Sequence, residues 1–228
     1  GRGRMKLLSF DSSAVTASVA LTDDGKVVRS EFVNAGLTHS ETLLPMIERV
    51  MGDVDYSRLD GIAVTAGPGS FTGVRIGVAT AKGLAFKHNT PCYSVSTLEA
   101  IAYNFVNKDC IVCAVMDARR MQFYNALFSI ENGVVSRLTP DRAIALDDLK
   151  KELVAYDEVI VAGDGARLCC DNTNLDNCFL ADEDTMYQNA VSVSLAAKNI
   201  NPLSPDELMP VYLRLSQAER ELKLKLKK

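Results

Sequence analysis

Histidine is scarce in this chain, because the 228 residues contain only two, His39 and His88. They form neither an H-E-x-x-H motif nor a pair at helical ligand spacing, so a histidine-rich metal centre cannot be assembled. A Ser-His-acid hydrolase would also need one of them, and neither lies in a recognisable nucleophile context. The sequence therefore disfavours metal-dependent and triad-type hydrolysis.

Long apolar runs are missing as well. No stretch approaches the roughly 18 apolar residues that a membrane span requires, and the early run at residues 7–10 is ended by Asp11. With no secretory leader in view, we expect a cytoplasmic protein without membrane association. Residues 1–4, before Met5, resemble residues left by an expression vector, so we expect the native chain to begin at Met5.

The cysteine pattern does not suggest a disulfide framework. Six cysteines in a chain of this length are too sparse for one, and we expect free thiols in a reducing compartment. Cys110 and Cys113 form a C-x-x-C within a strand-like segment, where residues three apart point to opposite faces of a sheet. Shared metal ligation by this pair is therefore disfavoured.

A basic surplus is absent too. The chain has 25 Lys and Arg against 29 Asp and Glu, a net charge of -4. Nucleic-acid binders usually carry excess positive charge, so we expect contact with nucleic acid only with the help of another protein. The basic tail at residues 222–228 is expected to be solvated, with at most a minor role in RNA contact.

What the sequence does contain is an internal repeat. Strand-like segments with an Asp-Gly or Asn-Gly hairpin turn occur in two sets: at residues 5–10, 15–21 and 27–33, and again at 111–116, 122–130 and from 134 onward. A helix and a strand follow each set, at 38–51 and 62–66 in the first half and at 146–156 and 159–162 in the second. The first half adds a helix at 74–87 and a strand at 92–95.

A duplicated β-β-β-α-β-α unit predicts an α/β protein with mixed sheets and helices packed on them. Two such lobes suggest the actin-like (ASKHA) architecture. We expect an N-terminal lobe at residues 1–104, a C-terminal lobe at 105–200, and a segment at 201–228 that returns to the N-terminal lobe and ends in the basic tail.

In this architecture the turn after the first strand of each lobe faces a cleft between the lobes. Asp11, Ser12 and Asp117 occupy these turns and are candidate nucleotide-cleft residues. Aspartate is also an ordinary turn residue, so a purely structural role stays open.

The most unusual segment, residues 65–77, contains Gly-Pro-Gly-Ser-Phe-Thr-Gly between a strand-like and a helix-like stretch. Such a connection can present backbone N–H groups to an anion. It is not a Walker A loop, because no Lys-Ser or Lys-Thr pair follows Gly73. We favour a tight strand-to-helix connection with Thr72 as the N-cap over phosphate binding.

Small residues mark the helix that follows. Gly73, Gly77, Ala81 and Ala85 recur every four residues, so one ridge is nearly bare backbone and something must pack closely on it. The preceding helix has more apolar surface than one core stripe needs. These two helices suggest an intermolecular surface, although packing inside the fold would explain the pattern equally well.

Five segments stand out when they are read together. They are Leu-Ser-Phe-Asp-Ser-Ser at residues 8–13, His-Ser-Glu-Thr-Leu-Leu-Pro at 39–45, Gly-Pro-Gly-Ser-Phe-Thr-Gly-Val-Arg-Ile-Gly at 67–77, Asp-Ala-Arg-Arg at 117–120 and Pro-Val-Tyr-Leu-Arg at 210–214. Together they resemble the TsaB (YeaZ) family of bacteria over almost the whole chain. The glycine-rich segment is highly specific, whereas the first and last segments would be weak alone.

The resemblance implies a role in making threonylcarbamoyladenosine beside the tRNA anticodon. It implies a non-catalytic partner, with no cofactor of its own, of the related metal-bearing transferase TsaD, with the ATPase TsaE joining the complex and tRNA bound only indirectly. The two helices would form the TsaD heterodimer and, without TsaD, a similar homodimer. The expected contact residues are Thr38, His39, Leu43, Leu44, Ile47, Gly73, Ile76, Gly77, Thr80, Ala81 and Leu84.

The comparison with TsaD also bears on metal binding. TsaD has a His-x-x-x-His metal pair after its glycine-rich helix and the next strand, where this chain has Thr97 and Ile101. Isoleucine cannot ligate a metal and neutral threonine is a poor transition-metal ligand, so we expect no metal site. The alternative to a scaffold is an ATP-using actin-like phosphotransferase or a metallopeptidase-like enzyme.

Overall fold

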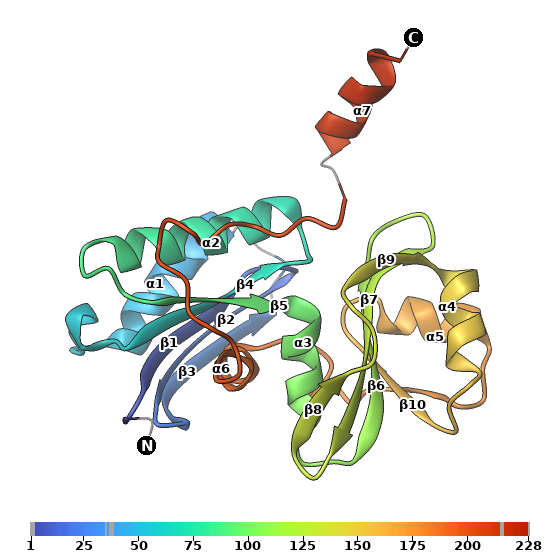
Figure 1. Cartoon of the computed structure of the whole chain (residues 1–228), viewed down its shortest axis with the longest axis horizontal. Helices are drawn as coiled ribbons and strands as arrows, with labels where there is room; N and C mark the ends of the chain where they lie inside the picture. Colours follow the sequence, from blue (N-terminus) through green and yellow to red (C-terminus); the bar gives the residue numbers. More distant parts are fainter. Residues whose placement is uncertain (1–2, 35, 37–38, 215–216, 228) are drawn as a thin grey trace.

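The first sheet begins with the predicted meander. The computed structural model describes residues 3–34, 36, 39–214 and 217–227, and Figure 1 shows two lobes side by side. The meander strands are β1 (Lys6–Asp11), β2 (Thr16–Asp23) and β3 (Lys26–Asn34). Asp24 and Gly25 both have positive φ, which a two-residue type I′ hairpin turn requires.

Two parallel strands complete the first sheet. They are β4 (Gly61–Gly67) and β5 (Cys92–Ser96), in the order β3-β2-β1-β4-β5. Because side chains alternate along a strand, each face of the sheet packs on its own helices. One face is covered by α1 (His39–Met51) and α2 (Phe71–Phe86) and the other by α6 (Ala190–Ala197), with η1 (Tyr56–Arg58) between α1 and β4.

The second sheet repeats this plan. Its strands are β6 (Cys110–Asp117), β7 (Gln122–Glu131), β8 (Val134–Arg137), β10 (Val159–Ala162) and β11 (Cys178–Leu180), in the order β11-β10-β6-β7-β8. A short β9 (Arg142–Ala145) also pairs with β7, and α4 (Leu146–Leu153) and α5 (Ala166–Thr173) complete the lobe. Asn132 and Gly133 repeat the positive φ values of the first hairpin. The duplicated, two-lobed actin-like fold is confirmed.

Two crossings join the lobes. The chain passes to the second lobe through α3 (Thr97–Ala102) and η2 (Tyr103–Phe105), and it returns before α6. Because α6 packs on Leu7, Ala63 and Tyr93 of the first sheet, the second lobe is smaller than the expected 105–200 range.

The last part of the chain lies on the first lobe. Leu203 forms an isolated β-bridge with Cys92, and Leu208 is buried in the core beneath α1 and α2. Beyond this segment α7 (Gln217–Lys225) projects away from both lobes (Figure 1). No helix within the described ranges combines the length and apolar character that crossing a membrane would require.

Candidate functional site

The glycine-rich turn between β4 and α2 packs directly on the serine turn that follows β1. The Ser70 N–H donates to the Ser13 carbonyl at 2.7 Å, and the Ser12 hydroxyl donates to the Gly73 carbonyl at 2.8 Å. A Cβ atom on Gly69 would lie 2.3 Å from the Ser13 carbonyl oxygen, and one on Gly73 would lie 2.2 Å from that of Ser12. Glycine is therefore required here by the close approach of two backbone segments.

Two backbone donors at the start of α2 are used within the protein. Ser70 is the N-cap, and its hydroxyl oxygen accepts from the Gly73 N–H at 3.3 Å. The expected N-cap at Thr72 is wrong, because the helix already begins at Phe71. Since the N–H groups of Ser70 and Gly73 are both occupied, the geometry favours the tight connection over a phosphate-binding turn.

Asp11, the last residue of β1, is the centre of a buried hydrogen-bond network. Its Oδ1 accepts from the Thr65 hydroxyl at 2.5 Å, from the Ser13 hydroxyl at 2.5 Å and from the Ser13 N–H at 3.2 Å. Its Oδ2 is buried and has no hydrogen-bond partner among the described residues. Gln188, on the return crossing, donates to the Ser13 hydroxyl at 3.2 Å, so the network joins the crossing to the first lobe.

Burial also controls the charge of this group. It raises the pKa of the Asp11 carboxyl, and the hydrogen bonds from Ser13, Thr65 and Gln188 oppose the rise. Asp11 is 0% exposed and Ser12 is 1% exposed. The expectation that both side chains face an open cleft is therefore corrected, because the chain's own turns cover them.

Asp117, the third candidate cleft residue, is exposed at the end of β6. Its N–H donates to Asp164 Oδ1 at 2.9 Å, and its own carboxylate accepts from the Arg119 N–H at 2.8 Å. Desolvation raises the pKa of Asp164, the hydrogen bond from Asp117 N–H opposes this, and the charges of Asp117 and Asp11 add to the rise. The structure thus brings acidic groups together between the lobes while withdrawing Asp11 from solvent.

The predicted small-residue ridge of α2 faces the protein's own core. Ala81 is 0% exposed, and a Cβ atom on Gly77 would lie 2.9 Å from Ser12 Oγ and 3.3 Å from a methyl group of Val64. Close packing on the ridge was correctly expected, but its partner is the chain's own sheet and serine turn. Five of the expected partner-contact residues are buried inside the chain itself, so their assignment to the partner surface is corrected. They are Leu43, Ile47, Gly73, Gly77 and Ala81.

The remaining expected contact residues lie nearer the surface. Leu44 is 45% exposed, and partial exposure is shared by His39, Ile76, Thr80 and Leu84; Thr38 lies outside the described residues. His39 Nε2 lies 2.5 Å from the Ala14 carbonyl oxygen, which ties the start of α1 to the turn after β1.

Sequence reasoning missed the small residues that do face outward. Ala79 and Gly83 are exposed, and a Cβ atom on Gly83 would meet nothing within 4 Å. Phe71 and Phe86, at the two ends of α2, are also exposed. A partner helix could therefore approach the outward ridge, two residues out of phase with the predicted one.

A C-terminal strap, residues 208–214, extends this surface. The Val211 N–H donates to the Ala66 carbonyl at 2.7 Å, and Tyr212 stacks on Phe71 with ring centroids 4.8 Å apart. Arg214 donates to the Ala118 carbonyl at 2.9 Å in the second lobe. The strap thus runs from the start of α2 to the other lobe, and the Pro-Val-Tyr-Leu-Arg segment was its only sequence signal.

The positions expected to lack metal ligands are both in α3. Thr97 and Ile101 are 0% exposed, and the Thr97 hydroxyl has no hydrogen-bond partner among the described residues. Within the described part of the chain, no group of three or more His, Cys, Asp or Glu side chains could hold a metal ion. The six cysteines are free, and burial raises the thiol pKa of Cys113 most clearly.

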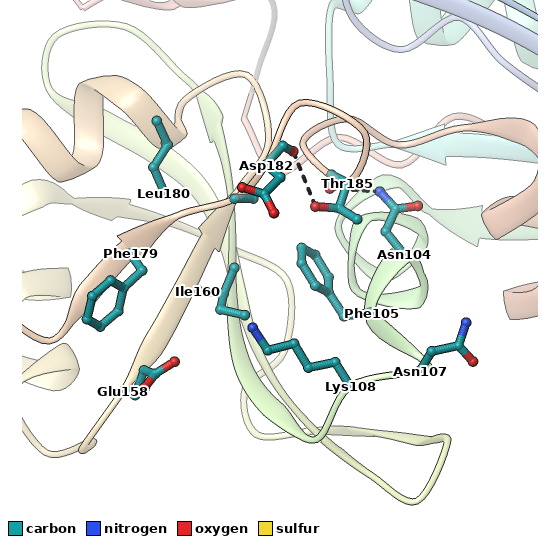
Figure 2. A pocket seen from close by; sticks show the side chains of 11 residues that line it. Asn104, Phe105, Asn107, Lys108, Glu158, Ile160, Phe179, Leu180, Asp182 and Thr185 are labelled. Atoms are coloured by element: carbon teal, nitrogen blue, oxygen red, sulfur yellow. Dashed lines mark hydrogen bonds between the residues drawn. The ribbon is translucent and has the colours of Figure 1, made fainter.

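A separate cavity of about 460 Å³ lies beside the first crossing, as Figure 2 shows. Phe105 and Lys108 line it from the crossing, and Ile160, Phe179 and Asp182 line it from the second lobe. It contains none of the expected site residues.

Asn104, at the rim of this cavity, clamps the two crossings together. Its Nδ2 donates to the carbonyls of Thr185 and Tyr187 at 3.0 and 2.8 Å. Its Oδ1 accepts from Asn189 Nδ2 at 3.0 Å and from the Ser192 hydroxyl. A single asparagine within the predicted first lobe carried no sequence signal for this role.

Comparisons with known proteins agree with this architecture. The family model described as TsaD, tRNA N6-adenosine threonylcarbamoyltransferase, matches residues 33–201. The tRNA threonylcarbamoyladenosine biosynthesis protein TsaB of Bacillus subtilis is 30% identical over 94% of this chain and 96% of its own length. The protein of the same name from Escherichia coli is 36% identical over 57% of this chain and 58% of its own length.

A solved structure is similar over nearly the full chain. YeaZ from Pseudomonas aeruginosa superimposes with a TM-score of 0.79 at 25% identity, covering 92% of this chain and 100% of that one.

Proposed function

Because this chain belongs to the TsaB (YeaZ) family of tRNA threonylcarbamoyladenosine biosynthesis proteins, we propose that it serves that pathway as a non-catalytic scaffold that binds TsaD. TsaD would transfer the threonylcarbamoyl group to the adenosine next to the tRNA anticodon. TsaE would join the complex, and this chain would meet tRNA only as part of the complex.

The observation that carries the proposal is the outward face of α2. This face combines small exposed residues, Ala79 and Gly83, with exposed aromatic rings at Phe71 and Tyr212. Small residues permit close helix approach, and tyrosine is one of the residue types enriched among those that contribute most to binding energy at interfaces. Leu44, in α1, is a further exposed apolar side chain among the expected contact residues.

The composition of α3 supports the non-catalytic part of the proposal. Thr97 and Ile101 stand where the resemblance to TsaD places metal-binding histidines, and both are packed in the core. A histidine substituted at either position would be buried away from solvent. We therefore propose that the activity resides in TsaD and that this chain contributes its surface, without a cofactor, in the cytoplasm.

Reconstituted threonylcarbamoyl transfer to tRNA tests the proposal. The assay contains the carbamoyl-adenylate synthase, TsaD, TsaE and tRNA, with and without this chain. We expect the rate of threonylcarbamoyl transfer to tRNA to fall sharply when this chain is left out. Threonylcarbamoyl transfer that is unchanged when this chain is left out would contradict the scaffold role.

The same surface would form the homodimer in the absence of TsaD. Sedimentation of the isolated chain across a range of concentrations measures self-association, and added TsaD should convert the homodimer to the heterodimer. A homodimer that persists beside bound TsaD would mean that the two contacts use different surfaces.

A further inference from the structure

The end of the chain differs sharply in charge from the rest. Residues 214–228 hold six Lys and Arg against two Glu, a net charge of +4, so residues 1–213 carry -8. Charge asymmetry of this size between a body and a terminal segment is typical of tails that bind a polyanion. The net charge of the whole chain conceals this difference.

The basic segment begins at a fixed point. The strap that precedes it is held by the Val211 hydrogen bond to β4, the Tyr212 stack on α2 and the Arg214 hydrogen bond to the second lobe. Beyond the strap, α7 projects clear of both lobes, and every described side chain from Glu221 to Lys227 is exposed. The positive charge is therefore presented to the surroundings from a defined place beside the α2 surface.

We propose that the C-terminal arm, residues 217–227, binds the phosphate backbone of the tRNA in the TsaD complex. This inference rests on the proposed function for the identity of the RNA. Three lysines, Lys223, Lys225 and Lys227, are exposed at and just beyond the end of α7. A polyanion complements their charge, whereas the acidic body of a second copy lacks the dense, linear charge of RNA.

The arm adds affinity without sequence readout. Each phosphate neutralised by a lysine releases counterions, so binding weakens with salt at a slope of about 0.7–0.9 log units per contact. An arm that emerges beside the partner surface would act at high effective concentration once TsaD has bound the same tRNA.

The test compares two triple variants of equal charge change. K223E/K225E/K227E reverses the arm, and K26E/K108E/K151E reverses three exposed lysines of the body. A labelled tRNA transcript is titrated with the TsaD complex of each variant and with each isolated chain, at several salt concentrations. Melting temperature and TsaD affinity are measured on the same samples.

We expect the arm variant to bind tRNA about tenfold more weakly at 0.1 M salt, with a shallower salt dependence, while the body variant changes little. TsaD affinity and melting temperature should stay unchanged in the arm variant. Equal loss in both variants, loss in neither, or an arm that binds anionic phospholipid vesicles without affecting tRNA would overturn the proposal. Failure of the wild-type chain to bind TsaD would overturn the proposed function instead, and the isolated chains would still report on the arm.

Discussion

The inward and outward faces of α2 are built from the same kinds of residue and have opposite environments. Gly77 and Ala81 press against β4 and the serine turn, whereas Ala79 and Gly83 face solvent. Small residues on the inward face shorten the distance between a helix and its own sheet. The same residues on the outward face leave room for another molecule.

This difference teaches that a small-residue ridge reports close packing without identifying the partner. The recurrence of Gly73, Gly77, Ala81 and Ala85 at every fourth position correctly indicates a close approach. The sequence does not show, however, that this set faces the core while Ala79 and Gly83 face outward. When most faces of a helix carry apolar or small residues, the helix is only weakly amphipathic. Periodicity then does not show which face packs on the core.

The largest expected effect on the folded state is that of Ala81→Arg. Ala81 is 0% exposed on the inward face of α2, so an arginine would both overpack the core and bury an unpaired charge. We expect the free energy of unfolding to fall by about 4 kcal/mol. Chemical denaturation measures this directly. A variant that unfolds like the wild type would place Ala81 on the surface and reverse the two faces.

A smaller effect is expected at the start of the helix. Ser70→Ala removes the hydroxyl that accepts from the Gly73 N–H, at a cost of about 1 kcal/mol. Thr72→Ala is the matched control and should change stability by less than about 0.5 kcal/mol. The urea midpoints of the two variants show whether Ser70 or Thr72 is the N-cap. A larger loss of stability in Thr72→Ala than in Ser70→Ala would identify Thr72 as the N-cap.

Asp11 belongs to the hydrogen-bond network of the serine turn, on which the inward face of α2 packs. Its titration makes the stability of the fold depend on pH. Because burial raises the Asp11 pKa, the folded state holds this proton more tightly than the unfolded chain, whose Asp pKa is about 3.9. The resulting stabilisation is complete below the unfolded pKa and is lost as pH rises through the raised folded pKa.

Asp11→Asn removes this titration, so its stability relative to the wild type should increase as pH rises. Thermal unfolding of both proteins across a pH series tests this, with the exposed Asp176→Asn as the control. A stability difference that runs the other way with pH would mean that Asp11 is stabilised as a carboxylate.

Much of the fold could be predicted because its signals are local. The Asp24-Gly25 and Asn132-Gly133 turns require positive φ, and alternating apolar residues on either side define the hairpins. The short β9 and β11 were missed, whereas β10, which has only four residues, was predicted from its uninterrupted apolar run. The small, mostly apolar α6 was missed because it is nearly uniform along its length.

The site was harder to predict because it depends on contacts between distant segments. The stack of Tyr212 on Phe71 and the hydrogen bond from Gln188 to Ser13 join residues far apart in the chain. Neither pair has a local signature. Asp11 is enclosed through a contact of the same long-range kind, the hydrogen bond from Thr65, and for that reason a residue that looked exposed is buried.

The most direct test of the account is the effect of Ala79→Arg on TsaD binding, measured beside thermal unfolding at matched protein concentration. Ala79 lies on the outward face, so an arginine there should leave the melting temperature essentially unchanged. The same side chain would block close approach of a partner, and we expect TsaD affinity to fall at least tenfold, or about 1.4 kcal/mol. Wild-type affinity in a correctly folded Ala79→Arg variant would contradict the assignment of this face to the partner.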